Sequence, residues 1–386
     1  MLILVKSARL ILPRKFMKIV VVVPTYNEKN NILTLISCLR EEFVRLSNHE
    51  WQLLVVDDHS PDGTGQLVRN AMGTYPFIHL SEGEKTGLGA AYARGFDYAI
   101  NNLSADLVFE MDADLSHDPH YLGPMVEAIE QGADVALGSR YIFGGALPPN
   151  WGIDRQLFSV LGNIVARAVL WVWSVRDFTS GFRATRVKGF LDQIDFSKLL
   201  SKQYAYKIHL LYSLHELGAV IKEVPIVFVD RERGYSKMPT NNILDSLRVV
   251  FTLRYRQLEQ FIKVCAVGTL GFVIQTVVYA LLLKFSSIAS FNAAVLGAEA
   301  AILVMFPVNN WWSFRNSAVG GSSYFKKLFQ FNLVAFGSMA IQWLVIYLAN
   351  GFFGPGWISN GLFYIIGILL GLIWNFTMYK KVVWRV

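Results

Sequence analysis

The sequence is short of cysteine and of charge. Of its 386 residues, only two are cysteines and only 17% are charged. Cys38 lies in a helical pattern and Cys265 in an apolar run, so neither a disulfide framework nor a zinc site is indicated, and the reducing cytosol fits. Hydrophobic residues make up 53% of the chain. This composition excludes an ordinary soluble globule and favours a membrane protein.

Negative charge is nearly missing from the last third of the chain. Residues 1–256 hold 28 Lys and Arg against 27 Asp and Glu, whereas residues 257–386 hold 8 against 2. Six of the seven net positive charges therefore belong to the hydrophobic part, where basic residues have a membrane explanation. The excess does not indicate a nucleic-acid-binding surface, and no nucleic acid partner is expected.

The first 16 residues lack an uninterrupted apolar core. Lys6 and Arg9 break the run, and no small-residue cleavage site follows, so the segment does not fit a secretory signal peptide. Residues 1–16 are interpreted as an N-terminal extension to which no function is assigned.

From Lys18 onward the pattern alternates between strand and helix. The expected strands cover residues 18–24, 51–58, 77–80 and 106–115. The expected helices cover 29–46 and 64–72, and residues 85–100 are expected to be a loop that leads into a helix. The first strand is continuously apolar, as a strand buried on both faces requires. This alternation predicts a mostly parallel α/β sheet, whose ligand sites lie at the carboxyl ends of its strands.

Two amphipathic stretches follow, residues 155–173 and 241–256. Each mixes Leu, Val and Phe with Arg, a composition typical of helices that lie in the lipid interface. The alternative is that both pack in the core of the α/β domain.

Four segments reach the length of about 20 residues that a membrane span needs. They cover residues 264–283, 291–312, 328–350 and 357–379. The loop stretches SSIAS, after the first segment, and GFFGPG, after the third, are uncharged, and the other three flanks are basic. The positive-inside rule therefore places both termini and the α/β domain in the cytoplasm. The expected domains are 17–238 for the α/β part, 239–257 for an interface helix and linker, and 258–386 for the four-span part.

Unusual polar residues gather at three expected strand ends. Residues 24–28 (PTYNE) end the first strand, Asp57 and Asp58 the second, and Asp112 and Asp114 the fourth. Two carboxylates spaced in this way on an extended segment can hold a hard divalent cation that bridges phosphate oxygens. The other two clusters would frame a base and a ribose: Tyr26 would stack, while Glu28 and Asp57 would accept hydrogen bonds.

The motifs PTYNE, VVDDHSPDGT, KTGLGAAYARGFDYA, DADLSHDP, GSRY and TSGFR occur in this order over about residues 17–240. In this the chain resembles the dolichol-phosphate mannose synthases, which belong to family 2 of the inverting glycosyltransferases. The resemblance implies a GT-A fold and an enzyme that transfers mannose from GDP-mannose to dolichyl or another polyprenyl phosphate at the cytoplasmic membrane face.

The resemblance also implies roles for individual residues. Those expected to bind the nucleotide sugar are Pro24, Tyr26, Glu28, Val55, Asp57, Asp112, Ala113, Asp114, Ser116, Arg140, Arg231 and Lys237. Among them, Asp112 and Asp114 would bind a divalent cation, Mg²⁺ or Mn²⁺. Arg140, Arg231 and Lys237 would hold phosphates, and these five residues form the expected catalytic set.

The chain departs from the family pattern at two positions. Ser116 stands where these enzymes commonly carry Gln, and His209 stands where a carboxylate is frequent. His209 is interpreted as a core or surface residue. Residues 230–238, which hold Arg231, Arg233 and Lys237 around Gly234, have the composition of a mobile basic loop that can close over a diphosphate.

The last third, about residues 258–384, resembles the GtrA-like four-span membrane family. Glu299 lies inside the second expected span, where a carboxylate is costly unless it is paired. It would mark either a transport path or a contact between helices.

Two alternatives to mannose transfer remain open from the sequence. The donor could be UDP-glucose or another nucleotide sugar, or the protein could be a flippase for lipid-linked sugars with a regulatory α/β domain. A processive polysaccharide synthase is disfavoured because the chain lacks a Gln-x-x-Arg-Trp motif.

Overall fold

The computed structural model describes residues 16–149, 151–229, 241–354, 356 and 361–385. The chain divides into two compact units, Met1–Arg254 and Tyr255–Val386, and each is described by itself. Residues 1–15 of the expected N-terminal extension and the expected boundary at residue 238 lie outside the described residues.

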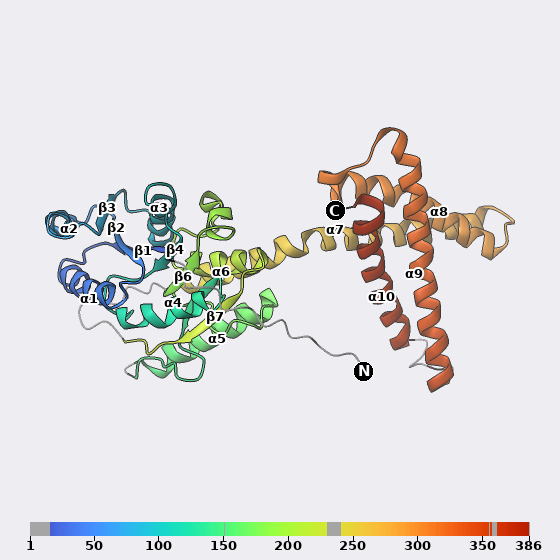
Figure 1. Cartoon of the computed structure of the whole chain (residues 1–386). Coiled ribbons are helices and arrows are strands. Elements are labelled where there is room, and N and C mark those ends of the chain that lie inside the picture. The colour runs from blue at the N-terminus through green and yellow to red at the C-terminus, as the bar shows by residue number, and fades with distance from the viewer. Residues whose placement is uncertain (1–15, 150, 230–240, 355, 357–360, 386) are drawn as a thin grey trace, which may run out of the picture. The chain divides into compact units, whose positions relative to one another are not determined.

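The first unit, here the catalytic unit, is built on a seven-stranded sheet in the order β3-β2-β1-β4-β6-β5-β7 (Figure 1). The strands are β1 (Lys18–Thr25), β2 (Glu50–Asp57), β3 (Ile78–Glu82), β4 (Leu107–Glu110), β5 (Val135–Ser139), β6 (Arg183–Arg186) and β7 (Ile221–Pro225). Neighbouring strands are parallel except where β6 pairs with β4 and β5. The predicted mostly parallel sheet is therefore confirmed.

Helices cover both faces of this sheet. They are α1 (Ile32–Arg45), α2 (Thr64–Met72), α3 (Leu88–Asn101), α4 (Leu122–Glu130), α5 (Ile153–Leu170) and α6 (Tyr206–Glu216), with short 3-10 segments at Pro119–Tyr121, Leu191–Gln193 and Phe196–Lys198. In β1, Val21 belongs to the buried cluster that contains residues of α1 and α4, and Val22 belongs to the cluster that contains residues of α3 and α6. Because both faces are covered, β1 is apolar from Ile19 to Pro24, as its sequence predicts.

Helix α5 is only partly packed. Asn163, Ala166 and Leu170 are buried, while Phe158 and Leu161 are exposed on its outer side. An exposed apolar face is what the interfacial interpretation of residues 155–173 requires.

Among the described residues, four helices are long and apolar enough to cross a membrane. They are α7 (Asn241–Phe285), α8 (Ser290–Val308), α9 (Tyr324–Phe353) and α10 (Phe363–Met378), and π-helical segments follow at Asn309–Ser313 and Tyr379–Trp384. Four such helices were predicted, although residues 357–360, the expected start of the last one, lie outside the described residues.

The amphipathic stretch 241–256 and the first expected span are one continuous helix, α7, and not two elements joined by a linker. The connecting residues 257–263 (QLEQFIK) contain neither Gly nor Pro, and nearly all of them are good helix formers. Nothing in this segment therefore breaks the helix.

The second unit, here the membrane unit, is held together largely by aromatic packing. The rings of Phe314 and Trp384 stack with centroids 4.0 Å apart, and Phe306 and Phe331 also contact Trp384. Glu299 of α8 has a partner as well, because the Asn332 side-chain amide nitrogen lies 3.1 Å and 3.0 Å from its two carboxylate oxygens. This contact between helices is one of the two roles considered for Glu299.

Candidate active site

The carboxyl ends of β1, β2 and β4 lie next to one another in the sheet. The parallel register pairs Thr25 with Asp57, and it pairs Val22 with Glu110. The loops that follow these three strands therefore leave the same edge, which is where ligands bind in parallel α/β sheets. These are the strand ends that carry the three predicted polar clusters.

Asp57 closes β2 and is almost fully buried. Its carboxylate accepts hydrogen bonds from Thr25 Oγ1 at 2.7 Å, from the Ser60 N–H at 2.8 Å and from Ser60 Oγ at 2.6 Å. A carboxylate offers about four acceptor positions, so one remains for a ligand hydroxyl. The neighbouring Asp58 pairs with Arg94 at 2.6 Å; burial raises the pKa of Asp58, and the bond from Arg94 offsets part of that rise.

Tyr26 and Glu28 lie in the loop after β1. The ammonium nitrogen of Lys85 lies 3.2 Å from the centroid of the Tyr26 ring, within the range of a cation–π contact. The Glu28 carboxylate accepts a hydrogen bond from the Asn31 side chain at 2.8 Å, and its N–H donates to Thr64 Oγ1 at 3.0 Å. A base that stacks on this face of Tyr26 would displace Lys85, which sequence reasoning did not single out.

Three of the predicted residues offer no polar side chain. Pro24 is half-buried, and Ala113 and Val55 are buried. The Val55 side chain packs in the core cluster on the α1 side of the sheet. Its predicted contact with a nucleotide therefore stays a prediction that only its backbone could fulfil.

Asp112 and Asp114 lie on a turn just beyond β4. The predicted strand 106–115 ends early, at Glu110, because the chain turns here and Leu115 adopts a positive φ of 63°. Asp114 Oδ1 accepts two hydrogen bonds from Ser116, from its N–H at 3.1 Å and from its Oγ at 2.6 Å. Ser116 therefore orients Asp114.

The two carboxylates fit part of a site for a hard divalent cation. Mg²⁺ and Mn²⁺ prefer oxygen ligands, and Asp112 and Asp114 supply two such groups on one turn. No group of three or more His, Cys, Asp or Glu side chains that could hold a metal ion occurs within the described ranges. The remaining ligands would be phosphate oxygens and water, as is usual for Mg²⁺.

Two buried basic side chains that were not predicted face Asp112. Lys207 Nζ lies 3.8 Å and His117 Nε2 lies 3.9 Å from Asp112 Oδ2. His117 Nδ1 accepts the N–H of Asp112 at 3.0 Å, and its ring stacks on Phe182. Burial lowers the pKa of His117, although the nearby Asp112 charge opposes this, so the imidazole is neutral near pH 7. His117 therefore holds the turn in place.

Lys207 reaches Asp112 across a glycine. A Cβ atom at Gly181, in the TSGFR motif, would lie 2.8 Å from Lys207 Cε and closer still to its ammonium group. The absence of a side chain at position 181 is thus what allows this buried lysine to lie beside the carboxylate.

A fully buried ion pair lies at the end of β4. Arg183 Nε and Nη2 donate to the two oxygens of Glu110 at 2.6 Å and 2.8 Å, and the Tyr206 hydroxyl donates to Glu110 at 2.9 Å. Burial alone would lower the pKa of Arg183, but the charge of Glu110 raises it on balance. The pair joins β4 to β6 two residues before Asp112, so it fixes the strand end that carries the carboxylates.

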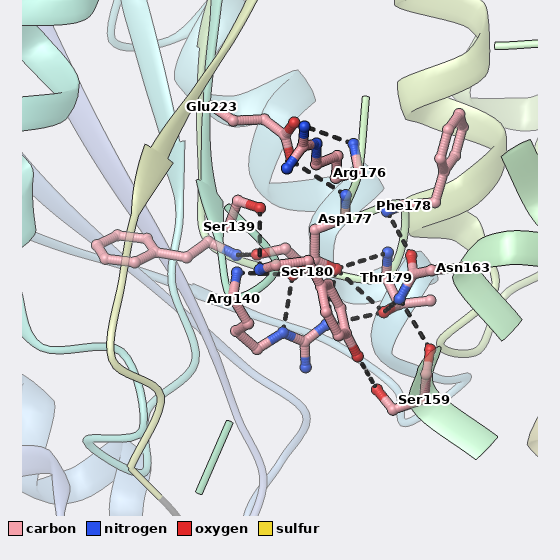
Figure 2. Close-up of polar contacts among 12 residues, drawn as sticks. Ser139, Arg140, Ser159, Asn163, Arg176, Asp177, Phe178, Thr179, Ser180 and Glu223 are labelled. Atoms are coloured by element: carbon pink, nitrogen blue, oxygen red, sulfur yellow. Dashed lines mark hydrogen bonds and ion pairs between the residues drawn. The ribbon is translucent and has the colours of Figure 1, made fainter. Parts of the chain in front are cut away.

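Arg140 follows β5 and is bound by a carboxylate of its own unit. Its Nε and Nη2 donate to the two oxygens of Asp177 at 2.8 Å and 2.7 Å, and Nη2 also donates to Thr179 Oγ1 at 2.8 Å (Figure 2). Burial alone would lower the pKa of Arg140, but Asp177 raises it on balance. The guanidinium predicted to hold a phosphate therefore has a buried counter-charge.

Arg231 and Lys237 lie outside the described residues, so their phosphate-binding roles stay predictions. His209 Nδ1 accepts the N–H of Leu200 at 3.0 Å, which agrees with its interpretation as a core residue.

The missed residues left weak signals in the sequence. Lys207 is a lone cation in the apolar stretch YAYKIHLLY, where a buried charge requires a partner. Asp177 stands directly before the Phe that leads into TSGFR. Neither signal identifies a partner, because Asp112 and Arg140 are far away in the chain.

Protein-family models match both units. The model described as glycosyl transferase family 2 matches residues 20–192, and the model of the GtrA/DPMS transmembrane domain matches residues 263–384. The first match falls within the catalytic unit and the second within the membrane unit.

Curated proteins match most of the chain. A polyprenol monophosphomannose synthase of Mycolicibacterium smegmatis is 39% identical over 236 residues, which is 61% of this chain and 86% of that protein. A dolichol-phosphate mannosyltransferase of Pyrococcus furiosus is 30% identical over 367 residues, which is 93% of this chain and 96% of that protein. A solved mannosyltransferase from Pyrobaculum calidifontis matches 94% of this chain and 87% of its own at 15% identity, with a TM-score of 0.41.

Proposed function

Since the chain belongs to glycosyltransferase family 2, in the group of polyprenol-phosphate and dolichol-phosphate mannose synthases, we propose that it transfers mannose from GDP-mannose to dolichyl or another polyprenyl phosphate. The reaction inverts the anomeric centre and takes place at the cytoplasmic membrane face. The chain is an integral membrane protein, and the basic flanks of its spans support the cytoplasmic orientation.

One observation carries this proposal above all. Asp112 and Asp114 lie together on the turn after β4, at the sheet edge that β1 and β2 share, in a chain that also carries four apolar helices. A lipid acceptor and a water-soluble donor meet at a membrane surface, so a chain that carries both strand-end carboxylates and apolar helices suits this reaction.

The donor would lie across the three strand ends. Tyr26 would stack on the base, and Asp57 would accept a bond from a ribose hydroxyl with the position that Thr25 and Ser60 leave open. Asp112 and Asp114 would hold Mg²⁺ or Mn²⁺ together with diphosphate oxygens. A bound cation of this kind neutralises charge on a leaving nucleoside diphosphate.

The acceptor needs no general base, because a lipid phosphate is already an anion at neutral pH and can attack the anomeric carbon directly. The site agrees with this, since the ring nitrogens of His117 face Asp112 and the ring is buried. The protein's task is to position the groups and to bring two anions close together. Lys207 places a positive charge beside Asp112, while Arg231 and Lys237 would bind phosphate groups.

The test is a donor panel with the purified full-length chain. The protein would be given Mg²⁺ or Mn²⁺, a polyprenyl phosphate and radiolabelled GDP-mannose, UDP-glucose or UDP-N-acetylglucosamine, with Asp114→Asn as the inactive control. We expect lipid-linked product from GDP-mannose alone. Product from UDP-glucose would reassign the donor, and the absence of product from every donor would overturn the enzyme assignment.

A further inference from the structure

A second pocket opens on the catalytic unit away from the strand-end carboxylates. Its volume is about 360 Å³, and it is lined by Tyr141, Val160, Asn163, Ile164, Arg167 and Arg176. Four of these residues belong to α5 and one lies between α5 and β6. None of the residues expected to bind the nucleotide sugar lines the pocket.

Arg167 brings an unused hydrogen-bond donor to this pocket. Its Nη2 donates to the Trp173 carbonyl at 3.3 Å, and its guanidinium lies 5.4 Å from the Trp173 ring. Its Nε is buried and has no hydrogen-bond partner. A buried N–H without a partner is costly, so a ligand that accepts from it gains more than an exposed contact would give.

Arg176 adds a second positive charge. Glu223 of β7 accepts the backbone N–H groups of Arg176 and Asp177, each at 3.0 Å, and Asp177 pairs with Arg140 (Figure 2). Within the described part of the chain, neither the Arg167 nor the Arg176 side chain has a carboxylate at ion-pair distance. The pocket therefore presents two guanidinium groups that form no ion pair.

The same helix exposes a broad apolar face next to the pocket. Leu157, Phe158, Leu161 and Ile164 are 56%, 60%, 52% and 48% exposed, and Trp171 follows at the end of the helix. Ile164 belongs to both the apolar face and the pocket lining. A helix with such a face and adjacent arginines lies in the plane of a lipid interface.

We propose that this pocket binds the phosphate headgroup of an anionic phospholipid while the outer face of α5 lies among the acyl chains. The headgroup accepts hydrogen bonds from Arg167 and Arg176, and the adjoining side chains contact hydrocarbon. A soluble anion would satisfy the arginines but leave the apolar face uncovered, so the two features together select a lipid. The inference goes beyond sugar transfer and does not depend on the identity of the donor.

The experiment measures lipid binding to the full-length chain without any nucleotide sugar. The detergent-solubilised protein is titrated with phosphatidylglycerol or phosphatidylcholine, and bound lipids are counted by native mass spectrometry. In the Arg167→Gln/Arg176→Gln double variant we expect the tightest phosphatidylglycerol to bind about 30-fold more weakly, with no change for phosphatidylcholine. The control is Arg45→Gln/Arg69→Gln, which removes two exposed charges from α1 and α2 and leaves binding unchanged.

Several outcomes would overturn the proposal. Equal phosphatidylglycerol affinity in parent and double variant shows that the pocket holds no headgroup. Displacement of phosphatidylglycerol by an equal concentration of inorganic phosphate makes it a soluble-anion site, and displacement by a lower concentration of short-chain polyprenyl phosphate makes it part of the acceptor site. An unchanged melting temperature of the double variant shows that the catalytic unit remains folded. Because lipid binding is measured without any nucleotide sugar, the test is separate from any failure of the proposed sugar transfer.

Discussion

The catalytic unit and the membrane unit treat buried polar groups differently. In the catalytic unit, two buried pairs of opposite charge form short hydrogen bonds, Glu110–Arg183 and Arg140–Asp177. In the membrane unit, Glu299 meets the neutral amide of Asn332, and stacked rings provide much of the packing. Ion pairs with two hydrogen bonds hold site residues in a defined orientation, whereas helices in lipid associate mainly through close packing.

Removing one partner of the Glu110–Arg183 pair should break this pattern most severely. Arg183→Met leaves the Glu110 charge buried and uncompensated, so we expect it to destabilise the catalytic unit by about 3–5 kcal/mol. Thermal unfolding of the detergent-solubilised protein measures the effect. Glu110→Leu combined with Arg183→Met should recover much of the loss, because replacing a whole buried pair is often neutral. A single variant as stable as the parent would show that the pair is not what holds β4 to β6.

The second prediction separates catalysis from folding in the same unit. Asp114→Ala should abolish transfer and remove the metal dependence of GDP binding, with little change in melting temperature, because this carboxylate contributes hydrogen bonds to a turn and no core packing. Turnover and calorimetric GDP binding with and without Mn²⁺ are the measurements. Asp112→Ala should also be severe. If GDP binding by the parent is independent of metal, the metal assignment is wrong.

The third prediction concerns whether the positive charge of Lys207 next to Asp112 contributes to catalysis and metal binding as well as to folding. Lys207→Gln removes the cation 3.8 Å from the carboxylate, and we expect turnover to fall about 10- to 100-fold, as for other groups that support metal ligands. The Mn²⁺ concentration for half-maximal GDP binding should shift as well, which a purely structural role would not cause. Lys202→Gln, an exposed neighbour in the same segment, is the control and should behave as the parent.

The smallest effect is expected in the membrane unit. Glu299→Gln keeps a hydrogen-bonding side chain opposite Asn332, so we expect a stability change below about 1 kcal/mol, in line with hydrogen bonds between membrane helices. Thermal unfolding in lipid nanodiscs provides the measurement, with Asn332→Leu as the comparison that leaves Glu299 without this partner and should destabilise more. A large loss for Glu299→Gln, comparable to that for Arg183→Met, would erase the contrast between the two units.

The local sequence pattern predicted individual strands and helices better than it predicted which strands and side chains pair with one another. The apolar run at residues 18–24 predicted β1 and the turn residues around Gly63 predicted α2, because strand and helix formation depend on neighbouring residues. The strands β5, β6 and β7 were not predicted. β6 has only four residues, among them the buried Arg183, so it shows neither an apolar run nor a simple alternation.

The sequence predicted those site residues that lie at the ends of strands. It did not predict the contacts that site residues make with residues far away in the sequence. Asp57, Asp112 and Asp114 lie where a parallel sheet places strand-end residues. The Arg140–Asp177 pair joins positions 37 residues apart, and the sequence around Arg140 does not indicate which carboxylate pairs with it. For the same reason Lys207 was not found, since the carboxylate it faces belongs to another strand end.

Because Lys207 packs against Gly181, the effects of substitutions at positions 181 and 207 depend on each other. A side chain at position 181 would push the end of the Lys207 side chain away from Asp112, and shortening residue 207 also removes the cation beside Asp112. Gly181→Ala should therefore lower turnover in this chain but have little further effect in the Lys207→Ser variant. Among relatives, those with a side chain at the position of Gly181 are therefore expected to carry a short or uncharged residue at the position of Lys207 and to balance the charge of the first carboxylate with a group from elsewhere in the protein.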